Sequence, residues 1–236
     1  MANIQLENVT FSYKYFSSIG GGLFKSSFGL KTKTAIKNLN LEIKMGDTVA
    51  LLGTNGAGKS TLLKLIAGVM TPETGEIKHL GKIYSFFGRN VGVMPQLSGY
   101  DNLKVRGLLL NLSDDFIAEK IIQISEFTEL GDDLYRPVST YSQGMRARLM
   151  FGMLMFVDAD ILLVDEGLAA GDKFFLEKTK NFVSNLLDQS KILLFASHSN
   201  ELLRRFCKKA LWLHNGELKK FGDFDEVLKQ YNNFKK

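Results

Sequence analysis

A glycine-rich segment in the first third of the chain constrains the fold most. Residues 53–60 read GTNGAGKS, which matches the pattern G-x-x-x-x-G-K-[ST] at every fixed position. The apolar run TVALL precedes it and the helix-like run TLLKLIA follows it. Glycines in such a strand–loop–helix unit let backbone N–H groups turn toward phosphate oxygens, and the helix start adds its positive dipole end. The sequence therefore predicts a phosphate-binding loop in an α/β protein.

Two side chains of this loop have the chemistry to hold a nucleoside triphosphate with its metal. The ammonium group of Lys59 is expected to reach the β- and γ-phosphates, and the Ser60 hydroxyl is expected to ligate Mg²⁺. The residues that the pattern assigns to the nucleotide are Gly53, Thr54, Asn55, Gly56, Ala57, Gly58, Lys59, Ser60 and Thr61.

A pair of carboxylates follows a second apolar run. Residues 161–164 read ILLV and are followed by Asp165 and Glu166. Such a run predicts a buried strand, and ligands of open α/β sheets bind beyond the carboxyl ends of the strands. Asp165 is therefore expected to hold Mg²⁺, directly or through water. Glu166 is expected to be the general base that orients the attacking water.

The rest of the chain alternates short apolar runs with helical patterns, as α/β proteins do. Further strands are expected over residues 4–9, 39–43, 48–52 and 192–196, and helices over 61–67, 173–187, 200–206 and 223–229. Hairpins are expected between 76–78 and 82–84 around Gly81, and between 210–213 and 217–221 around Asn215-Gly216.

Strand patterns vanish between residues 95 and 155, where Leu, Ile and Phe recur at helical spacing. We predict one domain, 1–236, with a mixed-sheet core, an N-terminal antiparallel β part and an inserted helical subdomain. The expected bounds are about 1–94 and 156–236 for the core, 95–155 for the helical subdomain and 14–37 for a basic insertion.

Composition excludes several classes of protein. Hydrophobic residues make up 45% and charged residues 23% of 236, which excludes wholesale disorder. The single cysteine, Cys207, excludes a disulfide framework, and we expect it to be inert. The first residues do not form a signal peptide, and the longest apolar stretch, 149–157, is too short to span a membrane. We therefore expect a soluble chain, or one that docks on a membrane through something else.

A third motif, YSQGM at residues 141–145, precedes Arg146 and Arg148. Ser142 and Gly144 are placed to open a helix, whose first turn would offer a hydroxyl and backbone N–H groups to an anion. A simple helix cap explains the same local pattern equally well.

The order of these motifs resembles the nucleotide-binding subunit of ABC transporters, from about residue 4 to residue 224. YSQGMRARLMF and DEGLAAGD look like the subfamily that exports capsule, O-antigen or teichoic acid, although Tyr141, Gln143 and Met145 replace Leu, Gly and Gln of the commoner signature. The resemblance implies an ABC cassette that binds ATP and Mg²⁺. It also implies a homodimer in which Tyr141, Ser142, Gln143, Gly144 and Met145 complete the ATP site of the partner copy.

Four further residues take their roles from the resemblance alone. Tyr13 matches the aromatic residue that stacks on adenine, with Phe11 and Tyr15 as competitors. Gln96 matches a metal-sensing glutamine, in a loop shorter than in most members. Asp172 matches an acidic residue at the dimer contact. His198 matches the histidine that contacts the γ-phosphate, which makes it catalytic together with Lys59 and Glu166.

The insertion at 14–37 gives the chain its excess positive charge. No acidic residue lies between Glu7 and Glu42, and the net charge of the chain is +5. The lysines of this stretch are Lys14, Lys25, Lys31, Lys33 and Lys37. Similar exporters carry a basic insertion here, so we expect contact with the permease or with anionic lipid headgroups. A solvated loop without a partner is the alternative.

The resemblance implies an ATPase on the cytoplasmic face of the inner or plasma membrane, bound there by a polytopic permease that handles a lipid-linked glycan. Two other functions stay open. The first is an ABC ATPase for a drug, peptide or small molecule. The second is a soluble ABC ATPase of DNA repair or translation, which the pI of about 9.1 fits. Such proteins carry coiled-coil arms or a second cassette, which this chain lacks, so we expect no nucleic-acid partner.

Overall fold

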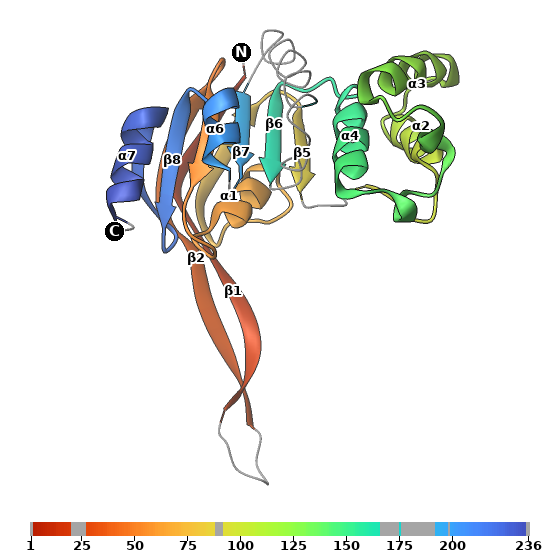
Figure 1. Ribbon diagram of the computed structural model, residues 1–236. Coiled ribbons are helices and arrows are strands. Elements are labelled where there is room, and N and C mark those ends of the chain that lie inside the picture. The colour runs from red at the N-terminus through yellow and green to blue at the C-terminus, as the bar shows by residue number, and fades with distance from the viewer. Residues whose placement is uncertain are drawn as a thin grey trace.

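The computed structural model describes residues 2–19, 27–87, 92–165, 175, 192–197 and 199–234, with side chains for all of these except 17–19 and 27–29. The described chain forms a six-stranded sheet with strand order β5-β6-β7-β3-β8-β9 and a three-stranded sheet with order β2-β1-β4. Helices cover the larger sheet, and a group of helices lies beyond its β5 edge (Figure 1). This arrangement confirms the predicted mixed sheet with an N-terminal antiparallel part and inserted helices.

The larger sheet is parallel except at one edge. Strands β3 (Thr48–Leu52), β6 (Ile161–Asp165) and β7 (Ile192–Ala196) are short apolar runs, and every residue in them is buried. A strand covered on both faces is expected to be a continuous apolar run without alternating polar residues, and such runs can be recognised in the sequence. Strand β5 (Ile83–Phe87) pairs in parallel with β6, while β8 (Lys209–His214) and β9 (Glu217–Asp223) form the predicted hairpin.

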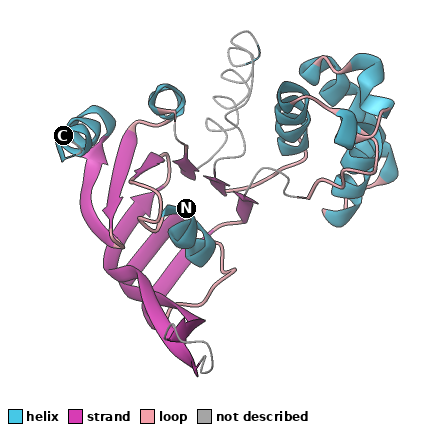
Figure 2. Cartoon of the chain, turned by 60° about the horizontal axis from the view of Figure 1, so that its bottom comes forward, coloured by secondary structure: helices cyan, strands magenta, loops and turns pink. Residues whose placement is uncertain are grey.

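Helices pack on both faces of this sheet (Figure 2). Helix α1 (Lys59–Ile66) fills the space toward the N-terminal sheet, in a core that includes Leu62 and Leu63. On the other face, α6 (Asn200–Phe206) and α7 (Phe224–Phe234) share a second core. Asp223 caps α7, since its Oδ1 accepts bonds from the Asp225 and Glu226 N–H groups. The helix expected over 173–187 lies, apart from residue 175, outside the described residues.

The N-terminal sheet extends into a long two-stranded ribbon. Strand β1 (Asn3–Ile19) pairs antiparallel with β2 (Ser27–Lys44), far beyond the short strands that the sequence predicted. The parts of β1 and β2 nearest the rest of the molecule contribute buried side chains to the core. Residues 13–19 and 27–33 project away from it and are called the arm here (Figure 1). Exposed side chains on the arm include Tyr15, Phe16 and Leu30.

One predicted hairpin is wrong. Strand β4 (Thr74–Leu80) pairs with β1, whereas β5 pairs with β6, so the segments on either side of Gly81 belong to different sheets. Asp160 holds the chain where it passes from one sheet to the other, because its carboxylate accepts a bond of 2.8 Å from the Lys82 N–H. Gly81 adopts a φ of +108°, and a Cβ there would lie 2.6 Å from the Cβ of Asp160.

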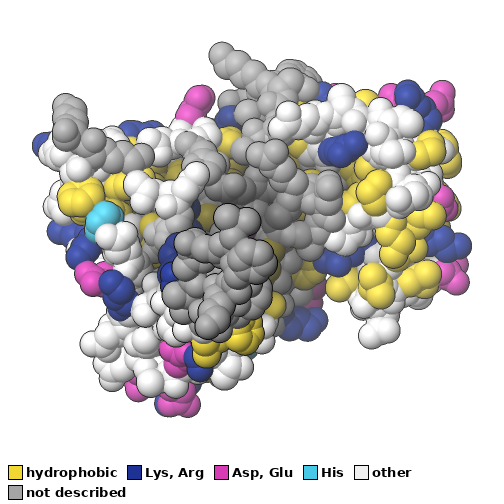
Figure 3. Space-filling view, turned by 90° about the horizontal axis from the view of Figure 1, so that it is seen from below, with side chains coloured by type: hydrophobic (Ala, Val, Ile, Leu, Met, Phe, Trp, Pro, Cys, Tyr) yellow, Lys and Arg dark blue, Asp and Glu magenta, His cyan; other side chains and the backbone are white. Residues whose placement is uncertain are grey.

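The helical lobe, residues 99–154, contains α2 (Gly99–Leu109), α3 (Asp114–Thr128), two short 3-10 turns (Gly131–Tyr135 and Val138–Thr140) and α4 (Gln143–Leu154). Its own core is built around Leu103, Ile121 and Leu149. Figure 3 shows hydrophobic side chains on the surface of this lobe. The exposed hydrophobic residues of the lobe include Leu108, Leu109, Phe116, Ile122 and Tyr135. Among the described residues, no helix is long and apolar enough to cross a membrane.

Candidate nucleotide-binding site

The loop at residues 53–60 leaves β3 and ends in the first turn of α1, as the sequence predicts. Gly58 is the N-terminal cap of α1 in a left-handed conformation, with φ +109°. A Cβ at Gly58 would lie 2.5 Å from the Ala35 oxygen, and a Cβ at Gly53 would lie 2.6 Å from the Leu213 oxygen. Both glycines are therefore required by close backbone contacts as well as by the turn itself.

Lys59 lies across the inside of this loop. Its ammonium group donates bonds of 2.7 Å to the Gly53 carbonyl and 3.2 Å to the Thr54 carbonyl, and the residue is only 8% exposed. These contacts hold the positive charge against the loop beside the helix N-terminus. The arrangement combines a cation, a helix dipole and backbone N–H groups, which is the chemistry that binds phosphate.

A pocket of about 340 Å³ opens beside the loop. The loop contributes residues 55–61, and strands β1 and β2 contribute the opposite wall through Tyr13, Lys33 and Ala35. The Tyr13 hydroxyl lies 3.0 Å from Thr61 Oγ1, and its ring packs edge-on against Phe11. Tyr13 is thus the aromatic residue that lines the pocket, which neither Phe11 nor Tyr15 does.

Asp165 ends β6 at the edge of the sheet from which the phosphate loop leaves. It pairs in register with Ala196 of β7, and Ala196 pairs with Leu51 of β3 on its other side. Asp165 therefore lies level with the end of β3, and its side chain is buried. Helix α1 packs against β6, so Ser60 and Asp165 approach the same edge. Glu166, Asp172 and His198 lie outside the described residues.

Gln96 lies just before α2 and does not line the pocket. Gln96 is exposed in a turn closed by the bond from the Leu97 N–H to the Met94 carbonyl. Asn102, buried in α2, fixes this turn: it accepts from the Met94 N–H at 2.7 Å and donates to the Met94 and Ser98 carbonyls. The sequence analysis missed Asn102, because a lone amide in a helical run carries no signal of its own.

The 141–145 segment begins α4, and Ser142 caps it by accepting a bond from the Met145 N–H. Tyr141 is buried, and its hydroxyl donates a 2.6 Å bond to the Asp133 carbonyl. Burial raises the pKa of Tyr141. Gln143 and Ser142 are exposed, and among the described residues a Cβ at Gly144 would meet only the Ser142 hydroxyl oxygen, at 3.9 Å. The helix start is therefore open to a ligand from outside the chain.

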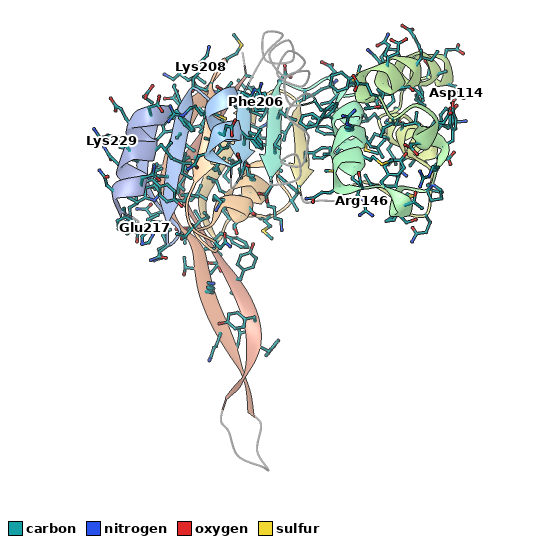
Figure 4. The ribbon with its side chains drawn as sticks, in the orientation of Figure 1. Asp114, Arg146, Phe206, Lys208, Glu217 and Lys229 are labelled. Carbon is teal, nitrogen blue, oxygen red and sulfur yellow. The ribbon has the colours of Figure 1, made fainter. Side chains whose placement is uncertain are left out.

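This helix start does not reach the pocket of its own chain. Figure 4 places Arg146 at the lower end of α4, on the far side of β5 from α1. Residues 141–145 do not line the pocket, whereas the phosphate loop and Tyr13 do. The residues of the 55–61 loop and Tyr13 therefore line one pocket, whereas residues 141–145 form a separate helix start on the same chain.

A support for the phosphate loop also escaped the sequence analysis. The turn of the β8–β9 hairpin touches the loop, since the Gly216 N–H donates to the Ala57 carbonyl at 3.1 Å. The Gly216 carbonyl accepts from the Lys37 N–H of β2 at 2.8 Å. Asn215-Gly216 was recognisable as a turn, but its position against residue 57 depends on the assembled sheet.

Comparisons with known proteins agree with this geometry. A family model described as ABC transporter matches residues 36–169. The chain is 36% identical to the teichoic acids export ATP-binding protein of Staphylococcus epidermidis, in a match covering 99% of this chain and 89% of that protein. It is 40% identical to the protein of the same name from Shouchella clausii, over 85% of this chain and 55% of that protein.

The relatives differ in length. In Bacillus anthracis a protein of the same name is 36% identical over 99% of this chain, which spans only 43% of it. This chain therefore spans about half the length of several curated relatives that it matches.

Solved structures give the fold. A dimeric ATP-binding cassette in a post-hydrolysis state, bound to ADP and Pi, matches with a TM-score of 0.75 at 22% identity, covering 94% of this chain and 98% of that one. A nucleotide-free cassette from an ABC transporter matches with a TM-score of 0.73 at 19% identity, covering 99% and 96%.

Proposed function

Since the chain belongs to the ABC transporter family, we propose that it is the ATP-hydrolysing subunit of a membrane exporter of a lipid-linked cell-surface polysaccharide such as teichoic acid. The observation that carries the ATPase proposal is the pocket between the phosphate loop and Tyr13. The polysaccharide cargo is supported by the relatives, which are teichoic acids export ATP-binding proteins.

In this proposal, the chain binds ATP through both walls of the pocket. The loop amides and Lys59 hold the phosphates, and Tyr13 stacks on the adenine. When phosphate oxygens enter, the Lys59 ammonium exchanges its carbonyl partners for charged ones, which form stronger hydrogen bonds.

The residues present also fit Mg²⁺. The Ser60 hydroxyl at the start of α1 and the Asp165 carboxylate at the end of β6 are hard oxygen donors at one sheet edge, and phosphate oxygens would complete such a set. Bound there, the metal would neutralise charge on the β- and γ-phosphates. Gln96 is proposed as a further metal contact, which requires the segment that precedes the helical lobe to move toward the pocket.

The proposed reaction uses residues of two copies. One copy supplies the phosphate loop, and the exposed α4 start at Ser142 and Gly144 of the other closes the site, because one chain keeps these groups apart. Glu166 takes the proton of the attacking water and His198 contacts the γ-phosphate, while Asp172 lies at the dimer contact. Loss of the γ-phosphate removes contacts to the Ser142 turn, so the dimer opens.

The remaining partners follow from the proposed transport role. A polytopic permease would hold the subunit on the cytoplasmic face of the membrane and handle the lipid-linked glycan. The basic insertion is proposed to touch the permease or anionic headgroups. No nucleic-acid partner is expected.

The ATPase proposal is tested with Glu166→Gln. We expect this variant to bind Mg-ATP, to hydrolyse it at least about 100-fold more slowly, and to elute as an ATP-dependent dimer. Glu201→Gln, an exposed carboxylate on α6, is the matched control and should turn over normally. Native turnover by Glu166→Gln would refute the assignment of the base. Wild-type protein that does not bind Mg-ATP would refute the whole proposal.

The exporter role is tested in cells that carry the tagged chain. Affinity purification from detergent-solubilised membranes should recover a polytopic membrane protein, and depletion of the chain should reduce surface glycan. Recovery of ribosomes or DNA in place of a membrane protein would contradict it.

A further inference from the structure

The arm adds a positive charge to the pocket that no motif assigns. Lys33 of β2 lines the pocket together with the phosphate loop, although it lies before that loop in a segment without a nucleotide-binding pattern. It stands directly across the ribbon from Tyr13, because these two residues are Cα partners in the antiparallel ladder.

Cross-strand partners place their side chains on the same face of a ribbon, with Cβ atoms about 5 Å apart. Tyr13 shows which face this is. Its hydroxyl lies 3.0 Å from Thr61 Oγ1 in the first turn of α1, so this face turns toward the phosphate loop. Lys33 therefore extends over the same opening from the side of the arm.

Among the residues that the structure describes, the charges lining the pocket are of one sign. The charged ones are Lys33 and Lys59, and none of the described lining residues carries a carboxylate. Lys59 is bonded to loop carbonyls on one wall, whereas Lys33 is exposed on the other. In the part of the chain that the structure describes, no ion pair shorter than 4 Å is recorded for Lys33. A polyphosphate between these walls would meet a cation on each side.

We infer that Lys33 is a second cationic contact of the bound nucleotide, holding its phosphate charge from the arm while Lys59 holds it from the loop. This inference rests on the proposed ATP-binding function and deepens it. It gives the residues at the base of the arm a role in nucleotide affinity. Lys31 lies on the same face two pairs further out, opposite Tyr15, and does not line the pocket, so the inference applies to Lys33 and not to Lys31.

The test is equilibrium binding of Mg-ATP to Lys33→Met, Lys33→Arg and the matched control Lys31→Met, at several salt concentrations. Methionine keeps the length and apolar stem of the side chain, so the ribbon should stay folded, which circular dichroism checks. Removing a partly exposed charge beside a polyphosphate should raise the dissociation constant of Lys33→Met about 3- to 10-fold at low salt, and less at high salt. Lys33→Arg and Lys31→Met should bind within about 2-fold of wild type.

Three results would overturn the inference. The first is an unchanged affinity of Lys33→Met for Mg-ATP. The second is an equal loss of affinity in Lys31→Met. The third is a loss of affinity in Lys33→Arg as large as in Lys33→Met, which would indicate a structural effect through Tyr13. Wild-type protein that does not bind Mg-ATP would instead refute the proposed function. The two failures are thus distinguishable.

Discussion

The contact between the β8–β9 turn and the phosphate loop gives a quantitative prediction for Gly216→Ala. Gly216 has a φ of +81°, and a Cβ there would lie 2.7 Å from the Ala35 oxygen and 2.9 Å from its carbonyl carbon. The left-handed conformation costs an alanine about 1–2 kcal/mol. Because the obstructing atoms are backbone, the turn itself must shift, which weakens the bonds to the Ala57 oxygen and the Lys37 N–H.

Each of these two bonds contributes about 1 kcal/mol, so the free energy of unfolding should fall by about 3 kcal/mol in total. Urea unfolding measures this loss. Since the Ala57 carbonyl belongs to the phosphate loop, Mg-ATP should also bind less tightly to the folded variant. Gly222→Ala on β9 is the matched control. A Cβ there meets no atom within 4 Å in the described parts of the chain, so stability should be unchanged or slightly higher. Equal stability and affinity of the two variants would refute the claim that this turn supports the loop.

Three other predictions concern buried polar groups and the cysteine. Tyr141→Phe removes the bond to the Asp133 carbonyl and should lower the free energy of unfolding by about 1–2 kcal/mol, as measured by urea unfolding. An unchanged free energy of unfolding would show that the bond is dispensable. Asn102→Leu leaves the Met94 N–H without its acceptor and removes the amide bond to the Met94 carbonyl, so it should cost about 2–4 kcal/mol, with faster proteolysis near residue 96. Unchanged cleavage would contradict this. Burial raises the pKa of the Cys207 thiol. At pH 8 this thiol should therefore stay protonated and react with thiol reagents only after the protein unfolds. Rapid labelling of the native protein would contradict its burial.

The elements that the sequence predicted well are those whose signal is local. The buried run at 48–52 and the helix at 200–206 have the predicted bounds, because a continuous apolar run or a capped helix is recognisable without its neighbours. The phosphate loop was equally readable, since its glycines are required by its own backbone. The helix start at Ser142 was readable because its hydroxyl caps the helix locally.

Other features depend on pairing between distant segments and were not readable. The arm is a strand pair held by backbone bonds, and its two faces do not alternate against a core, so its sequence lacks the usual strand pattern. The segments around Gly81 look like a hairpin locally, but pairing with β1 and β6 separates them. Lys33 and Gly216 reach the pocket only through the assembled sheets.

Strand β2 runs without a break from residue 27 to residue 44, from the arm past the phosphate loop. The carbonyl oxygen of Ala35 lies where a Cβ atom at Gly58 or at Gly216 would be placed. The backbone of β2 therefore contacts the backbone of the loop and of its supporting turn directly. A displacement of the outer ribbon is therefore expected to reach the loop at residues 53–60 along one continuous backbone. A partner that binds the outer part of the arm would therefore contact the same strand that forms one wall of the pocket.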